Sequence, residues 1–386
     1  MESESGSTET REERKSNWRS WVMIALLVYA LLVAVNVISD GFQLATMAAG
    51  AEQLFEFASN PIIALIIGIV ATAAVQSSST VTSVIVGMVA GGLPMSIAIP
   101  MIMGANVGTS LTSTLVSLGH IRDDDEFARA FSAATVHDNF NILAVAILFP
   151  LELLFSPLER ISYVVAGWLP TGSADGMGDF GFLGFLVGPL VDAIGAVGAL
   201  MPEIWDGVLL IFIGVAMIIG VVTALSKLLK KVMVGRALRI METAVGRGPV
   251  SGVGAGATIT VMVQSSTTTT CLIVPMAGSG VFSLRQVYPF TLGCNIGTTI
   301  TALVAALGVT GANAPLALQI ALVHLFFSLL AIAIIVSIPV LRTLPMVMSR
   351  TLARYARRNK LYVFAYIGCV FFLMPLIVLG CTRLLF

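Results

Sequence analysis

Two short polar runs interrupt long apolar stretches of this sequence, and their side chains could bind ions. Each run is a glutamine followed by four hydroxyl residues: Gln76, Ser77, Ser78, Ser79 and Thr80 in the first, and Gln264, Ser265, Ser266, Thr267 and Thr268 in the second. One hydroxyl in an apolar helix can bond back to a carbonyl a turn earlier, but four in succession cannot all do so. A broken helix offers N–H and O–H donors to an anion, here predicted for both runs, and oxygens to a cation.

Two glycine-rich segments carry neutral oxygen ligands in the same order. Each segment holds an asparagine and a threonine, which are Asn106 with Thr109 and Asn295 with Thr298. The glycines let a helix open and let the backbone approach a ligand, and the side-chain oxygens suit a cation. In both segments two glycines lie four residues apart, a spacing that is equally typical of close helix packing, so both interpretations stand.

The motifs form an internal repeat. Gln264 follows Gln76 by 188 residues, Asn295 follows Asn106 by 189, and a Val-His pair at 136–137 returns 187 residues later at 323–324. This kept order predicts two homologous halves, 18–150 and 205–341. Halves of opposite orientation would place a substrate site where they meet.

One carboxylate lies within an apolar span. An ionisable residue inside a membrane is a functional hypothesis by default, so Asp138 is expected to be a cation ligand, together with Asn141 one turn on. The alternative is a buried hydrogen-bond partner near a helix end. We expect His137 and His324 to be packed, hydrogen-bonded histidines rather than proton carriers. The acidic run that begins at Asp123 is interpreted as a solvated helix N-terminus, and a role in cation entry is weaker.

Composition narrows the chemistry further. Of 386 residues, 57% are hydrophobic and 11% are charged, which excludes a soluble protein and predicts an all-α multi-pass membrane protein. The 21 basic and 21 acidic residues balance, so no nucleic-acid partner is indicated. No acidic residue follows Glu242, so a cation site in the second half must use neutral oxygens, which sodium tolerates better than divalent ions.

The apolar runs give a topology. Seven runs are long enough to cross a bilayer: 18–38, 95–118, 127–150, 205–226, 286–308, 315–341 and 361–382. The stretches 61–91 and 251–282 are each divided by a Gln-Ser-Ser run into arms too short to cross alone, which predicts two re-entrant helical hairpins. The first would enter from outside and the second from inside, as inverted repeats require.

Basic residues fix the expected orientation, because Lys and Arg collect in cytoplasmic loops. With a cytoplasmic N-terminus, every basic cluster falls inside the cell membrane. The expected organisation is a disordered tail (1–17), the first repeat (18–150), a short extracytoplasmic connection (151–204), the second repeat (205–341) with a basic cytoplasmic segment (226–250), a second basic segment (342–360) and a final span (361–386).

At these residues the sequence resembles the type II sodium-dependent phosphate cotransporter family, in a short bacterial-type form. The resemblance lies in both Gln-Ser-Ser runs, in Gly-Ala-Asn-Val-Gly-Thr-Ser at 104–110, in Val-His-Asp at 136–138 and in Gly-Cys-Asn-Ile-Gly-Thr-Thr at 293–299. It implies sodium-driven uptake of inorganic phosphate by alternating access, with sodium as the co-transported ion and no other cofactor. Phosphate would lie between the two hairpin tips.

The resemblance also implies roles for single residues. Positions that match sodium sites of the family are Gln264, Ser265, Thr298, Thr301, Asn141 and, less closely, Asp123. An aspartate at position 138 implies electrogenic transport. Cys294 replaces a serine often found before the second asparagine, and the short, cysteine-free central connection lacks the disulfide-bearing loop of the animal members.

Other functions fit the residues less well. A sodium-coupled carrier of sulfate or a dicarboxylate shares every physical feature above, and only the family motifs favour phosphate. No Gly-x-Ser-x-Gly motif is present, so a membrane serine hydrolase, and with it an enzyme, is not expected. A channel would need a continuous pore. A homodimer is compatible with the sequence, which does not determine the assembly.

Overall fold

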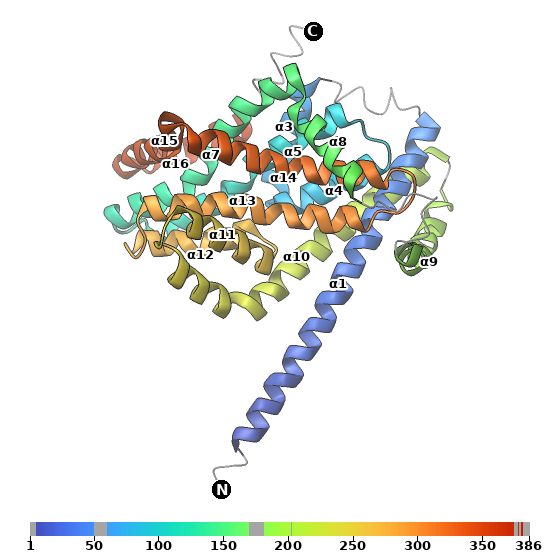
Figure 1. The fold of residues 1–386 in the computed structure, drawn as a ribbon, viewed down its shortest axis with the longest axis horizontal. Helices are drawn as coiled ribbons and strands as arrows, with labels where there is room; N and C mark the ends of the chain where they lie inside the picture. Colours follow the sequence, from blue (N-terminus) through green and yellow to red (C-terminus); the bar gives the residue numbers. More distant parts are fainter. Residues whose placement is uncertain are drawn as a thin grey trace.

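The computed structural model describes residues 5–49, 60–169, 181–201 and 203–373, with residues 377 and 380, and these residues form helices joined by turns (Figure 1). Six helical segments are long and apolar enough to cross a membrane: Trp18–Ala48, Met95–His120, Asp124–Phe155, Trp205–Ala244, Leu284–Leu307 and Ala314–Ser337. These confirm six of the seven predicted spans and the all-α membrane class. The seventh, 361–382, lies partly outside the described residues.

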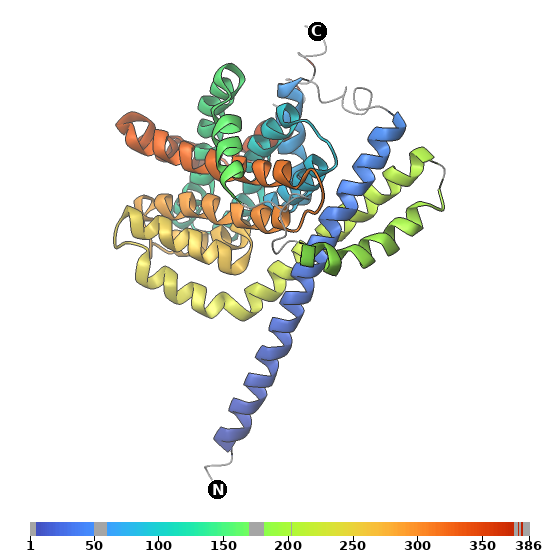
Figure 2. The ribbon, with the colours of Figure 1, turned by 45° about the vertical axis from the view of Figure 1, so that its right-hand side comes forward.

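The first half of the chain supplies seven α-helices. They are α1 (Ser5–Ala49), α3 (Pro61–Val75), α4 (Ser78–Ala90), α5 (Met95–Val107), α6 (Leu111–Ser117), α7 (Asp124–Phe155) and α8 (Pro157–Trp168). Helix α1 begins at Ser5 and so extends over most of the segment 1–17, which the sequence analysis expects to be disordered; Glu, Arg and Lys in that segment are good helix formers. Helix α9 (Gly181–Gly198) lies in the central connection beside α1 and α10 (Figure 2).

The second half follows the same order. Its helices are α10 (Glu203–Ala244), α11 (Pro249–Val263), α12 (Ser266–Gly278), α13 (Leu284–Leu307), α14 (Ala314–Ser337), α15 (Pro339–Arg358) and α16 (Leu361–Gly368). Most of the basic segment 226–250 continues the membrane helix α10. Helix α14 ends where Ile338 is extended, because the residue before a proline is pushed out of the helical region.

Corresponding helices of the two halves make reciprocal contacts. Helices α1 and α10 pack on each other, and α4 packs on α14 as α12 packs on α7. The amphipathic helices α8 and α15 are likewise exchanged, because α8 lies on α14 and α15 lies on α7. A single apolar core therefore contains residues of both halves.

The glycines of the repeated motifs lie at two close helix crossings. A Cβ added to Gly104 would collide with the carbonyl oxygen of Leu65 on α3, and one added to Gly293 would collide with that of Val253 on α11. Opposite them, Gly256 meets the carbonyl oxygen of Phe290 in the same way. Of the two interpretations of these glycines, the contacts support helix packing, since only a residue without a side chain lets two backbones approach so closely.

Candidate functional site

Both Gln-Ser-Ser runs form a sharp turn between two short helices. Gln76 has φ 56° and Gln264 has φ 53°, left-handed conformations that non-glycine residues adopt rarely. The following serine is extended and caps the next helix: the Thr80 N–H donates to Ser77 Oγ at 3.3 Å, and the Thr268 N–H donates to Ser265 Oγ at 3.1 Å. Each turn therefore directs the N-terminus of a helix, α4 or α12, at the point where the chain reverses.

The glutamine side chains are held by threonines of the neighbouring helix. Thr112 Oγ1 donates to Gln76 Oε1 at 3.2 Å, and Thr301 Oγ1 donates to Gln264 Oε1 at 2.7 Å. Thr112 and Thr301 are separated by 189 residues, the same offset as the asparagines. The structure thus joins Thr301 to Gln264, two of the residues named as sodium ligands. Thr112 escaped the sequence analysis, although the offset could have identified it.

Several other hydroxyls of the runs are buried at the starts of α4 and α12. Ser78, Ser79 and Thr80 are buried, and so is Ser266, whereas Thr267 and Thr268 are partly exposed. The carbonyl oxygens of Ser79 and Ser266 accept hydrogen bonds from hydroxyls later in the same helix. Part of each polar cluster therefore satisfies its own helix backbone.

A chain of buried amides and imidazoles connects the two glycine-rich segments. His137 Nε2 lies 2.6 Å from Asn295 Oδ1, and Asn295 Nδ2 donates to Asn141 Oδ1 at 2.7 Å. Asn141 Nδ2 donates to the carbonyl oxygen of Asn106 at 2.8 Å, and His324 Nε2 lies 3.2 Å from Asn106 Oδ1. All five side chains are buried. Each histidine therefore contacts the asparagine of the other half.

The remaining threonines named as sodium ligands make local bonds. Thr109 Oγ1 donates to the Ala105 carbonyl at 3.1 Å, and Thr298 Oγ1 donates to the Cys294 carbonyl at 2.8 Å. Both are buried one turn beyond the asparagines. Their oxygen lone pairs face the same glycine-opened part of the helix crossing only as far as this back-bonding allows.

Asp138 has a partner that the sequence could not indicate. Tyr366, on α16, donates its hydroxyl to Asp138 Oδ2 at 3.0 Å, and the aspartate is only 1% exposed. Asn141, which the sequence grouped with Asp138, instead pairs with the asparagine that contacts His137. On α7, His137 and Asn141 are one turn apart and share a face, while Asp138 is rotated from it towards α16.

Asp123 lies at a different place from the other named residues. Its Oδ1 accepts the N–H groups of Asp125 and Glu126 at 2.9 and 2.8 Å, so it caps the start of α7, about 22 Å along the helix from Asp138. These hydrogen bonds, that of Glu126 first, lower the pKa of the Asp123 carboxyl, which is exposed. A cap at that distance cannot share an ion with Asp138.

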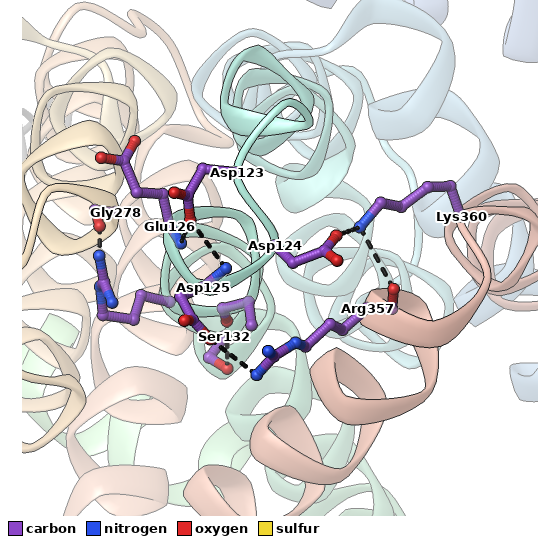
Figure 3. A network of polar contacts seen from close by, with 10 residues as sticks. Asp123, Asp124, Asp125, Glu126, Ser132, Gly278, Arg357 and Lys360 are labelled. Carbon is purple, nitrogen blue, oxygen red and sulfur yellow. Dashed lines mark hydrogen bonds and ion pairs between the residues drawn. The ribbon is translucent and has the colours of Figure 1, made fainter.

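The acidic run at this helix start is paired with the basic end of α15 (Figure 3). Arg357 lies 2.7 Å from the Asp125 carboxylate, and Lys360 lies 2.8 Å from that of Asp124. Lys360 also sits 4.0 Å from the centre of the Phe127 ring. The run is therefore an ion-paired contact between the two halves as well as a helix N-terminus.

Comparison with known proteins agrees with this arrangement. The Na+/Pi-cotransporter family profile matches residues 30–167 and 216–380, which include both turns, both asparagines and both histidines. The chain belongs to this family.

Members of the family with assigned names share about a third of their residues with it. Sodium-dependent phosphate transport protein 2A of Rattus norvegicus is 32% identical over 92% of this chain, and protein 2B of Homo sapiens is 29% identical over 93%. The chain spans 66% and 64% of the lengths of these two relatives. No solved structure shows a significant match.

Proposed function

We propose that this protein takes up inorganic phosphate together with sodium, by alternating access between two inverted repeats. Family membership and the names of the relatives support the substrate and the coupling ion. The observation that carries the mechanism is the reciprocal contact of His137 with Asn295 and of His324 with Asn106. A two-fold axis pairs every contact between the halves with its mirror, which is the pattern of an isologous interface.

The proposed repeats begin at 18 and 205 and include the predicted boundaries at 150 and 341. Because α8 and α15 are exchanged between the halves, we assign each amphipathic helix to the repeat that precedes it. The connection 169–204 then joins the repeats outside the cell membrane, and the N-terminus and the basic segments lie in the cytoplasm.

Phosphate binding is assigned to the ends of α4 and α12 at the two turns. The first-turn N–H groups of a helix have no partners within it and carry partial positive charge, so they attract an anion. Ser77 and Ser265 add hydroxyl hydrogens at the same ends. No Lys or Arg occurs within either short helix pair, so co-bound cations must neutralise the phosphate.

Sodium is assigned to the neutral oxygens beside the second turn and to the amide chain. Gln264 and Thr301 already lie within hydrogen-bonding distance, and the asparagines offer further oxygens. An anion that enters a dry site alone loses its hydration without compensation, so sodium binds first. The Asp138 carboxylate supplies the negative charge for an additional sodium ion, which makes transport electrogenic.

Radiolabelled phosphate uptake into proteoliposomes tests this proposal. An inward sodium gradient should drive accumulation that an equal potassium gradient does not, and excess sulfate should leave it intact. Ser265→Ala should reduce uptake at least tenfold, whereas Ser265→Thr, which keeps the cap and the hydroxyl, and Ser279→Ala, at an exposed helix end, should retain it. Uptake that ignores sodium, or that sulfate abolishes, would overturn the assignment of ion or substrate.

A further inference from the structure

A groove of about 770 Å³ opens between α11, α13, α14 and α15, away from the turns and the amide chain. Its body is apolar and includes Val253, Leu292 and Val336. These four helices contact one another in sequence around it, and Figure 1 places α11, α13 and α14 side by side. Nothing in the proposed transport cycle uses this groove.

Three arginines stand at one end of the groove. Arg285 is in the first turn of α13, and Arg342 and Arg350 lie two turns apart on one face of α15. All three are exposed, and no carboxylate pairs with any of them among the residues described. The expected topology puts this end at the cytoplasmic surface, where the inner leaflet presents anionic headgroups.

One buried polar group in the groove lacks a partner. Tyr288 is 4% exposed, lies one turn deeper than Arg285 on the same face of α13, and lines the groove. Its hydroxyl makes no hydrogen bond to any residue that the structure describes. Since a buried donor left unpaired is costly, a ligand with an acceptor oxygen just below the arginines would satisfy it.

From these features we infer that the groove binds one anionic phospholipid of the inner leaflet. The arginines hold the phosphate of the headgroup, the Tyr288 hydroxyl donates to an oxygen of the glycerol ester region, and an acyl chain fills the apolar body. A soluble anion would leave the apolar body empty. A zwitterionic or neutral lipid would leave the arginine charges uncompensated.

Binding to the delipidated full chain tests this inference, by native mass spectrometry and thermal stability in detergent. Phosphatidylglycerol should bind at one copy per chain and raise the Tm, and phosphatidylcholine or inorganic phosphate should do neither. Arg285→Gln with Arg342→Gln should weaken phosphatidylglycerol binding about 30-fold, and Tyr288→Phe about fivefold.

Two further variants separate a built site from general charge attraction. Arg236→Gln with Arg239→Gln removes the same charge from α10, outside the groove, and should leave binding unchanged. Val347→Trp fills the groove with every charge retained and should abolish binding while the lipid-free Tm stays close to wild type. The inference is overturned if the α10 variant weakens binding equally, if the tryptophan variant still binds, or if phosphatidylcholine or free phosphate binds as tightly.

Discussion

The two halves share a backbone plan but differ in charge. Each half has a left-handed glutamine turn, a serine cap, a glycine-lined crossing and an asparagine that meets the other half's histidine. Only the first half places a carboxylate after its histidine: Asp138 has Leu325 as its counterpart. The comparison teaches that the shared contacts define the architecture and its exchange between states, while the unshared carboxylate sets the charge that moves with the substrate.

The strongest test of the comparison is to remove one asparagine from each half. Asn295→Leu leaves both the His137 nitrogen and the Asn141 amide oxygen without a partner, whereas Asn106→Leu leaves only the His324 nitrogen, because its backbone carbonyl remains. We expect losses in the free energy of unfolding of about 2–5 kcal/mol and about 1–3 kcal/mol respectively. Denaturation in detergent measures both, and equal losses would contradict the assigned contacts.

The carboxylate is tested by neutralising it. Asp138→Asn keeps an oxygen for the Tyr366 hydroxyl and removes one charge from the transport cycle. One charge moving through 100 mV corresponds to about 2.3 kcal/mol, so the effect of an imposed potential on phosphate accumulation should fall by up to about 50-fold. Asp123→Asn, which keeps the helix cap, is the matched control. An unchanged response to potential in Asp138→Asn would remove electrogenicity from the proposal.

The crossings allow a sharper version of the same comparison. Gly256→Ala in α11 and Gly68→Ala in α3 should each destabilise the protein by about 1–3 kcal/mol, because the new methyl group meets the carbonyl oxygen of Phe290 or of Met101. Gly254→Ala, two residues away in α11, has open space and should be neutral or slightly stabilising. Equal Tm values for Gly254→Ala and Gly256→Ala would show that the crossing is looser than the structure describes.

The smallest effect concerns the cap of α7, which has no counterpart in the second half. The pKa of Asp123 is lowered in the folded protein, so its stabilisation is present above the unfolded value and is lost as pH falls below about 4. Asp123→Ala should lower the Tm slightly at pH 7, and the difference should shrink as the pH falls towards 3. A difference that is constant across this range would show that the charge contributes nothing.

Sequence reasoning found most of the candidate site because the site is repeated. Two copies of Gln-Ser-Ser and of Gly-x-Asn-x-Gly-Thr in the same order separate functional hydroxyls from incidental ones, and the same offset would have added Thr112. Hydropathy located the spans because each must bury its backbone in a layer of fixed thickness.

Contacts between distant segments were beyond the sequence. The pairing of Asp138 with Tyr366, 228 residues away, and the ion pairs that join Asp124 and Asp125 to the end of α15 have no periodic signal. The sequence by itself determined the composition of each polar cluster, its depth in a span and the existence of two halves, because these follow from local chemistry and spacing. Only the tertiary structure decided which histidine meets which asparagine and that Asp138 faces α16, because the rotation of one helix against another is set by side-chain packing across the whole core.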